Sequence, residues 1–276
     1  MKMLRLALAL SLPIALAACT KGPPEDTGPV VEGDADSDAD SDTDTDTDAD
    51  GDADCDISGA TPVYEELFGA DGAVVGANPY TTDAGLGAII ADKPAEGETL
   101  TGEWVVTGAV VGAVGYYPEG SNPSNIWFND VNGTVRTYYV DPGVALSGGE
   151  VVSFTATEIK NYYGTLEITA MGEVTVTGSD KVWLTDGNNT TLSYETHAEQ
   201  FVYAWGEIMD EGVECGGSTS YTCFDFQYGA NTTTLRILSS KGVVQGDCAQ
   251  VVVPLGTYSG ADQMDVSDLD WFDWID

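Results

Sequence analysis

The chain has 276 residues, with nine Lys and Arg against 46 Asp and Glu, so its formal net charge is −37. Residues 57–276 alone carry six cations and 31 acids. Such a surface repels polyanions, and phosphate binding requires cations, so we expect no nucleic-acid partner. The 33 Gly and 13 Tyr, together with few apolar residues at helical spacing, favour an all-β protein.

Residues 1–20 have the order of an export signal: two cations, a short apolar run and small residues. The apolar run is too short for a stable membrane span. Its end, Leu16-Ala17-Ala18-Cys19, resembles the lipobox of bacterial lipoproteins. The resemblance implies a signal peptide at 1–18, lipidation of Cys19 and, because Thr20 follows, a lipid-anchored outer-membrane protein of a Gram-negative bacterium. An ordinary signal peptide with an incidental Cys is the alternative.

Residues 19–56 are first rich in Pro and Gly and then alternate Asp with small residues. Such a segment cannot bury apolar area and its charges repel, which predicts a disordered, extended linker. Asp46, Asp48 and Asp50 also match the first half of a calcium loop. The position that requires a bidentate Glu is Ile57, however, so we prefer the spacer interpretation. Loosely bound calcium is the only cofactor left open.

Four cysteines remain in an exported chain, which suggests two disulfides. Four cysteines allow three pairings, and we favour Cys215 with Cys223 and Cys55 with Cys248. The chain has a single His and no Cys-x-x-Cys, so a zinc site is not expected.

Residues 57–98 read as an irregular lead-in with at most a turn or two of helix near 63–68. Regular strands are predicted from Thr99 onward. The run 104–111 is a long strand whose internal Gly108 indicates a bulge or bend. The turn signal Asn132-Gly133 predicts a hairpin between residues 126–128 and 135–140. Strands at 151–156 and 165–168, joined by a Tyr-Tyr-Gly turn, complete a set of five.

Five strands with a bent first strand resemble the OB-fold, a small Greek-key barrel. The motifs Val105–Val111, Ile126–Asp130 and Leu146–Val151 with Tyr163-Gly164 also resemble OB-like domains of secreted bacterial proteins. Similar domains occur in Asp-rich surface lipoproteins of delta-proteobacterial type. The resemblance covers residues 99–176 and implies a fold without a chemistry.

A second strand set follows at residues 200–208, 223–226, 234–238 and from 246 onward. Matching Gly, Arg and Gly residues of the two sets are 98, 100 and 96 positions apart, which indicates a duplication. The predicted organisation is a lead-in at 57–98, a first OB-like barrel at 99–180 and a second at 181–276. Residues 181–194 are either an extra hairpin or part of the second barrel.

OB-folds bind oligonucleotides or sugars on strands two and three. The aromatic and basic candidates on these strands are Trp127, Phe128, Arg136, Tyr138 and Tyr139 in the first copy and Phe224, Phe226 and Arg236 in the second. Alternation would turn half of such aromatics into the core, so core packing is the competing interpretation. The two arginines could clamp an anion together or pair with local carboxylates.

No motif for nucleophilic, phosphate-binding or metal-dependent catalysis is present, and no catalytic residue is predicted. The sequence therefore predicts a lipid-anchored cell-envelope protein with a non-enzymatic binding or structural role, whose partners are the membrane and an envelope glycan or protein. The first alternative is a carbohydrate-binding module of the outer membrane. A weaker one is a carboxylate-based hydrolase, which would leave no signature. The C-terminal segment 265–276 is expected to close the second barrel or to form a docking tail.

Overall fold

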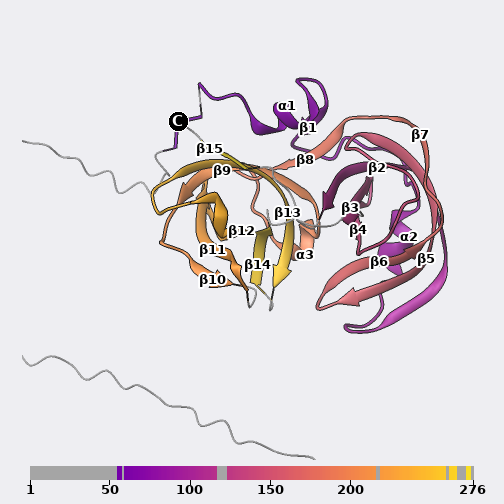
Figure 1. Cartoon of the computed structure of the whole chain (residues 1–276). Coiled ribbons are helices and arrows are strands. Elements are labelled where there is room, and N and C mark those ends of the chain that lie inside the picture. Colours follow the sequence, from indigo (N-terminus) through magenta and orange to yellow (C-terminus); the bar gives the residue numbers. More distant parts are fainter. Residues whose placement is uncertain are drawn as a thin grey trace, which may run out of the picture. The chain divides into compact units, whose positions relative to one another are not determined.

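Figure 1 shows a computed structural model of the chain, which describes residues 55–57, 59–116, 123–215, 218–258, 261–265 and 272–274. These residues belong to one compact unit, Asp48–Asp276. The expected signal peptide at 1–18, the lipidation site Cys19 and the calcium candidates Asp46, Asp48 and Asp50 lie outside the described residues.

The first half of the described chain forms a closed five-stranded barrel. Its sheet order is β2-β3-β4-β6-β5, and pairing of β5 with β2 closes it. The neighbours β4 and β6 are parallel, and the other pairs are antiparallel. This is the topology of an OB-fold, so the expected fold class is confirmed. The strands are β2 (Thr99–Tyr116), β3 (Pro123–Asp130), β4 (Gly133–Thr137), β5 (Glu150–Tyr162) and β6 (Thr165–Met171).

Alternation of apolar and polar residues explains these strands. Val152, Phe154 and Ala156 of β5 are buried in the barrel core, whereas the residues between them are partly exposed. The strand β2 is bent at Gly108, whose φ is 86° and where the register with β5 shifts. The predicted bulge is therefore present, and it allows one strand to serve two sides of a small barrel.

The hairpin between β3 and β4 forms with a turn one residue earlier than predicted. Asp130 pairs with Gly133, so the central turn residues are Val131 and Asn132. The Asn132 amide donates to Asp130 Oδ1 at 2.7 Å, and this side-chain contact stabilises the earlier turn. The strand β4 also ends at Thr137, before the predicted end at Val140.

The second half repeats the same barrel. Its order is β9-β11-β12-β14-β13, closed by pairing of β9 with β13, and β12 and β14 are its parallel pair. A short strand, β10 (Val213–Cys215), extends β11 as a hairpin. The predicted duplication is therefore present in the topology. The barrel strands are β9 (Phe201–Ile208), β11 (Ser218–Tyr228), β12 (Asn231–Leu238), β13 (Cys248–Tyr258) and β14 (Ala261–Asp265).

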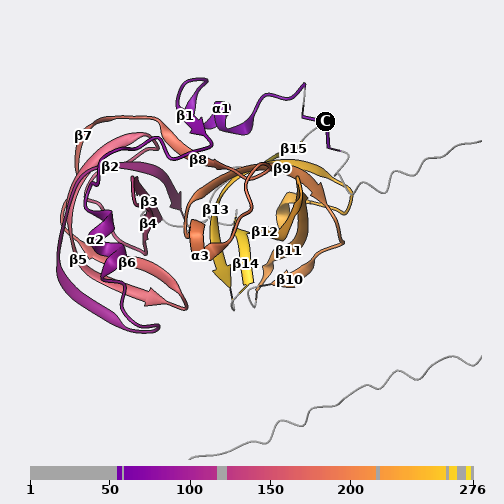
Figure 2. The ribbon, with the colours of Figure 1, turned by 180° about the vertical axis from the view of Figure 1, so that it is seen from behind.

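The lead-in is more ordered than the sequence indicated. The helix α1 (Val63–Phe68) was expected, but β1 (Ala73–Val75) and α2 (Leu86–Ala91) were not. The helix α2 buries Leu86 and Ile89 in the first barrel's core and contacts β2 and β4. Both views draw it at the first barrel (Figure 1, Figure 2). The strand β1 pairs in parallel with β8 (Val182–Asp186), which in turn pairs with β9 of the second barrel. The lead-in thus contributes to the core of the first barrel and extends the sheet of the second.

Other short elements complete the description. The strand β7 (Thr175–Ser179) adds to β5, and α3 (Tyr194–His197) and a 3-10 turn, η1 (Ser239–Lys241), lie within the second half. The C-terminal strand β15 (Phe272–Trp274) pairs with β13. The C-terminal segment was expected to close the second barrel, but the closing pair is made by β9 and β13.

Both favoured disulfides are present. Cys55–Cys248 connects the end of the linker to β13, and Cys215–Cys223 links β10 to β11. Across the described ranges, we find no helix with the length and apolar character needed to span a membrane.

Candidate functional site

Four tyrosines form an exposed cluster on the first barrel, which we call the tyrosine patch. Their exposed fractions are 46% for Tyr138, 54% for Tyr139, 47% for Tyr162 and 71% for Tyr163. The ring centroids of each sequence-adjacent pair are 4.7 Å apart in an edge-to-face arrangement. The rings of Tyr138 and Tyr162 are nearly parallel, with centroids 6.4 Å apart. The patch therefore presents two aligned ring planes and their hydroxyls to solvent.

Strand register explains how distant residues meet at this patch. Trp127, Arg136, Glu167 and Lys160 are direct cross-strand neighbours along β3, β4, β6 and β5. Their chain neighbours Phe128, Val135, Ile168 and Ile159 point into the barrel core, so this row faces outward. Tyr138 follows Arg136 by two residues, and Tyr162 follows Lys160 by two, which places both tyrosines on the same outer face.

The turn between β5 and β6 holds the second tyrosine pair. Tyr163 and Gly164 both have positive φ, 48° and 94°, as a tight two-residue hairpin turn requires. The Gly164 amide donates to Asn161 Oδ1 at 3.0 Å, and Lys93 Nζ donates to the Gly164 carbonyl. The turn that carries Tyr163 is thus fixed from both sides.

Backbone strain concentrates at this face. Within the described ranges, three residues other than glycine have positive φ: Tyr139, Tyr163 and Glu199. An L-residue in this conformation costs roughly 1–2 kcal/mol, and such strain is retained mainly where it serves a ligand site or a switch. Two of the three are in the tyrosine patch, and Glu199 contacts Arg136 in the outward row.

Arg136 and Glu167, in the middle of the outward-facing row, belong to a buried ionic network with Glu199. Arg136 contacts Glu167 at 2.7 Å and Glu199 at 3.6 Å, and both carboxylate side chains are almost completely buried. Trp127 Nε1 and the Tyr194 hydroxyl each donate to Glu199 at 3.2 Å. The Trp127 ring packs edge-to-face on Phe201 of β9. The second barrel therefore covers Trp127, which lies at the β3 end of the row.

The electrostatics of the network follow from burial. Burial raises the pKa of Glu167 above its usual value, although Arg136 opposes this change. For Arg136, burial acts to lower the pKa, but Glu199 and Glu167 outweigh it and hold the pKa above its ordinary value. Burial, followed by the charge of Glu199, raises the pKa of Tyr194. The arginine thus stays charged and holds two acids in place.

The predicted ligand-face residues separate into two groups. Phe128, Phe224 and Phe226 are core residues and Trp127 is covered by the second barrel, so for these four the core-packing alternative is confirmed. Tyr138 and Tyr139 are exposed, whereas the predictions missed Tyr162 and Tyr163. The signal for the missed pair was a second Tyr-Tyr doublet directly before a turn Gly.

The two arginines occupy equivalent positions but do not act together. Arg136 pairs with Glu167, and Arg236 pairs with Asp265 at 2.8 Å. In each barrel the acid is the cross-strand neighbour on the parallel strand. Pairing with a local carboxylate is therefore the correct interpretation, and the repeated ion pair supports the duplication. In the part of the chain described, no cluster of three or more His, Cys, Asp or Glu is arranged to hold a metal ion.

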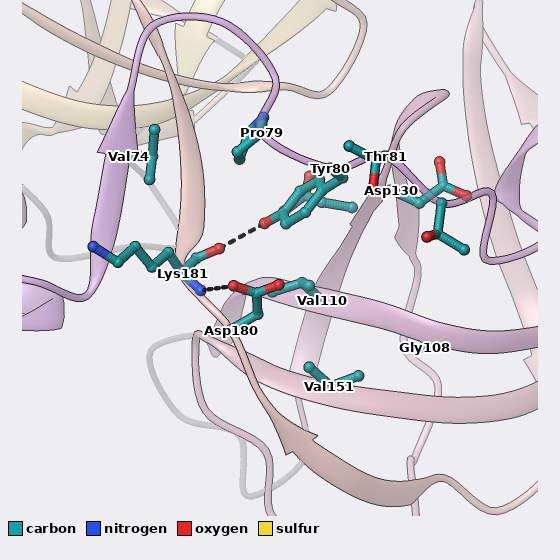
Figure 3. A pocket seen from close by; sticks show the side chains of 12 residues that line it. Val74, Pro79, Tyr80, Thr81, Gly108, Val110, Asp130, Val151, Asp180 and Lys181 are labelled. Atoms are coloured by element: carbon teal, nitrogen blue, oxygen red, sulfur yellow. Dashed lines mark hydrogen bonds between the residues drawn. The ribbon is translucent and has the colours of Figure 1, made fainter.

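Figure 3 shows a separate small pocket between the lead-in and the first barrel. Its volume is about 260 Å³. Tyr80 and Lys181 both line it, and the Tyr80 hydroxyl donates to the Lys181 carbonyl at 2.8 Å. Ligand pockets for small molecules usually have about 300–1,000 Å³. The pocket is therefore a weaker candidate than the tyrosine patch. Its walls include Val74, Pro79, Thr81, Gly108, Val110, Asp130, Val151 and Asp180.

Neither a family model nor a curated protein matches the chain. Solved structures similar to it include the tetrameric p202 HIN2 domain, at 11% identity and a TM-score of 0.36 over 65% of this chain and 95% of that one. A murine DNA-binding protein bound to double-stranded DNA has 11% identity and a TM-score of 0.34 over 63% of this chain and 95% of that one. The Ifi202 HINa domain in complex with 20 bp double-stranded DNA has 11% identity and a TM-score of 0.31 over 64% of this chain and 98% of that one. These likenesses concern the fold alone.

The comparison corrects one expectation. The charge of the chain led us to expect no nucleic-acid partner, but two of these similar structures are complexes with double-stranded DNA. The expectation is contradicted and withdrawn, because average charge does not describe the local surface where a ligand would bind.

Proposed function

We propose that this protein is a lipid-anchored cell-envelope protein that binds a saccharide chain, without catalysis, through the tyrosine patch. The observation that carries the proposal is the cluster of four exposed tyrosines in mutual contact on the outer face of the first barrel. OB-folds bind oligosaccharides and oligonucleotides on the face of strands two and three and through the loop between strands four and five. The patch lies where β4 ends and where β5 turns into β6.

The chemistry of tyrosine suits a sugar. Each ring offers an apolar face that can stack on the C–H face of a pyranose, and each hydroxyl can hydrogen-bond to a sugar hydroxyl. Two nearly parallel rings, those of Tyr138 and Tyr162, can contact successive parts of one chain. Contiguous exposed apolar surface on a soluble domain is uncommon and often marks an interaction site.

Two buried carboxylates support a non-enzymatic role over the hydrolase alternative. Glu167 and Glu199 are two acids that the fold brings close to one cation, but Arg136 binds both and neither is open to solvent. Paired catalytic carboxylates must flank a substrate bond. Turnover of envelope polysaccharides by the purified protein would contradict this part of the proposal.

The Tyr163→Asn variant tests binding without loss of stability. Asn-Gly is the favoured pair for a turn with two positive φ angles, so the variant relieves strain at residue 163. We expect the free energy of unfolding to stay level or rise by up to about 1 kcal/mol. We expect affinity for the saccharide to fall about tenfold, which corresponds to about 1.4 kcal/mol. Glycan-array binding and thermal unfolding measure the two effects.

Val244→Ala is the matched control, because Val244 is 58% exposed and lies in the second half of the chain. It should leave saccharide binding unchanged. Unaltered binding by Tyr163→Asn would place the site elsewhere. Tyrosine-dependent binding of single-stranded nucleic acid, with no saccharide bound, would replace the proposed ligand class.

The anchor is proposed from Leu16-Ala17-Ala18-Cys19 and its order after two cations and an apolar run. Cys19→Ala removes the thiol that would be acylated, and acyl chains bind a membrane through buried methylene groups. We expect the variant to leave the outer-membrane fraction and accumulate as soluble or unprocessed protein. An unchanged outer-membrane fraction of Cys19→Ala, measured by fractionation and immunoblotting, would refute the anchor.

A further inference from the structure

We infer that the saccharide bound at the tyrosine patch is acidic, and that Lys160 and Lys93 contact its carboxylate groups. This inference rests on the proposed function and adds the charge of the ligand to it. It follows from the position of the two lysines and from the finding that, among the described residues, neither forms an ion pair of 4.0 Å or less with a carboxylate.

Lys160 lies inside the patch. It is on the outer face of β5, two residues before Tyr162, and its Nζ is 5.0 Å from the centroid of the Tyr162 ring. This distance is within the range of a cation–π contact, which holds the ammonium group beside the ring. A sugar stacked on these tyrosines would therefore have a positive charge next to it.

Lys93 supplies a second ammonium group at the other tyrosine pair. It follows α2 and is exposed, and its Nζ donates to the carbonyl of Gly164, the residue after Tyr163. One carbonyl uses only one of the three N–H donors of a lysine. The remaining donors of Lys93 are available to a ligand at the turn.

The charge of the whole chain makes these lysines unusual. With 46 acids against nine cations, a lysine would be expected to find a carboxylate on this surface. Arg136, Arg236 and Lys181 do so, at 4.0 Å or less. Within the described ranges, neither Lys93 nor Lys160 forms such an ion pair, and Glu167, the cross-strand neighbour of Lys160, is bound by Arg136 instead. The fold thus keeps two cations beside the exposed rings.

The number of lysines indicates the type of anion. Two ammonium groups can pair with one or two carboxylates of a saccharide in which only some residues are charged, such as a uronate-containing chain. A polymer with a phosphate on every residue needs a longer track of cations to be held by charge. A carboxylated saccharide also uses the ring faces and the ammonium groups together.

The test compares oligogalacturonate with the same oligomer after methyl esterification, which removes the charge and keeps the sugar. Both belong to an array in which each acidic saccharide is paired with a neutral counterpart. The array is probed with the full chain in detergent, and calorimetry then measures the affinity of each pair that binds. We expect the acidic member of a pair to bind at least about fivefold more tightly, and the difference to shrink between about 50 and about 500 mM salt. Lys160→Met and Lys93→Met should each remove most of the difference.

Three controls keep the result interpretable. Lys160→Arg retains the charge and should retain the preference for the acidic saccharide. Lys181→Met removes a cation that pairs with Asp71, outside the patch, and should change nothing. Methionine keeps most of the apolar stem of lysine, so an unchanged melting temperature confirms that each variant is folded.

The outcomes separate the inference from the proposed function. Tyrosine-dependent binding with equal affinity for acidic and neutral members, unaffected by Lys160→Met and Lys93→Met, would overturn the inference and leave the proposed function intact. Failure of every saccharide to bind would overturn the proposed function and the inference with it. Tyrosine-dependent binding of single-stranded oligonucleotides alone would have the same effect and identify the other ligand class.

Discussion

Replacing Arg136 with Met is expected to lower the free energy of unfolding by roughly 3–5 kcal/mol, because it leaves two buried carboxylates without a cation. The side chains of Glu167 and Glu199 have exposed fractions of 2% and 3%, so water cannot replace the lost charge. Trp127 and Tyr194, which donate to Glu199, would lose their fixed acceptor position. Urea unfolding followed by tryptophan fluorescence measures the change.

The internal repeat provides the matched control. Arg236 has the same strand position, but its carboxylate partner is Asp265, whose side chain is 26% exposed. It also stacks on the Tyr221 ring at 4.0 Å. Since a partly exposed ion pair contributes little, Arg236→Met should cost only about 1 kcal/mol. Equal losses for the two variants would show that burial of the first network does not contribute to stability as argued.

The second large effect is expected for the disulfide Cys55–Cys248. It joins residues 193 positions apart, whereas Cys215–Cys223 joins residues 8 apart. The loss of loop-closure entropy gives roughly 5 kcal/mol for the first and roughly 2.5 kcal/mol for the second. The double variant Cys55→Ala/Cys248→Ala should therefore melt well below Cys215→Ala/Cys223→Ala.

Thermal melts of both double variants, without reductant, compare the two disulfides directly. The wild type with reductant should melt no higher than the less stable variant. A larger loss for Cys215→Ala/Cys223→Ala would show that strain or local packing, and not loop length, determines the contribution of each disulfide.

The barrels could be predicted because their strands are specified by local alternation. In β5, each second residue from Val152 to Ala156 is apolar, and the chain then turns at Tyr163-Gly164, so strand, face and turn follow from nearby residues. The turn of the β3–β4 hairpin moved by one residue because Asp130 binds the Asn132 amide, a side-chain effect that dipeptide preferences do not include. The lead-in was missed for another reason. The partner of Ala73 is Val182, and no local pattern indicates a pairing over that distance.

The candidate site could be predicted only in part. Alternation correctly implies that Trp127 and Tyr138 share a face opposite to Phe128, but it cannot tell that the second barrel covers Trp127 and leaves Tyr138 open. The rings of Tyr138 and Tyr162 come together only in the folded barrel, where β4 and β5 both pair with β6. Lys93 reaches the turn only through the fold of α2, so its contribution was not visible in the sequence.

The disulfide that begins the described chain also determines how the protein would carry a load. If the chain is anchored through Cys19, as proposed above, tension between the anchor and a ligand on the first barrel would pass through Cys55. The covalent bond to Cys248 passes that tension directly into β13, which pairs with β9, β14 and β15 of the second barrel. From Cys55 the tension would then have two covalent routes to the first barrel, one through the lead-in and one through Cys248 and the second barrel, so both would bear the load.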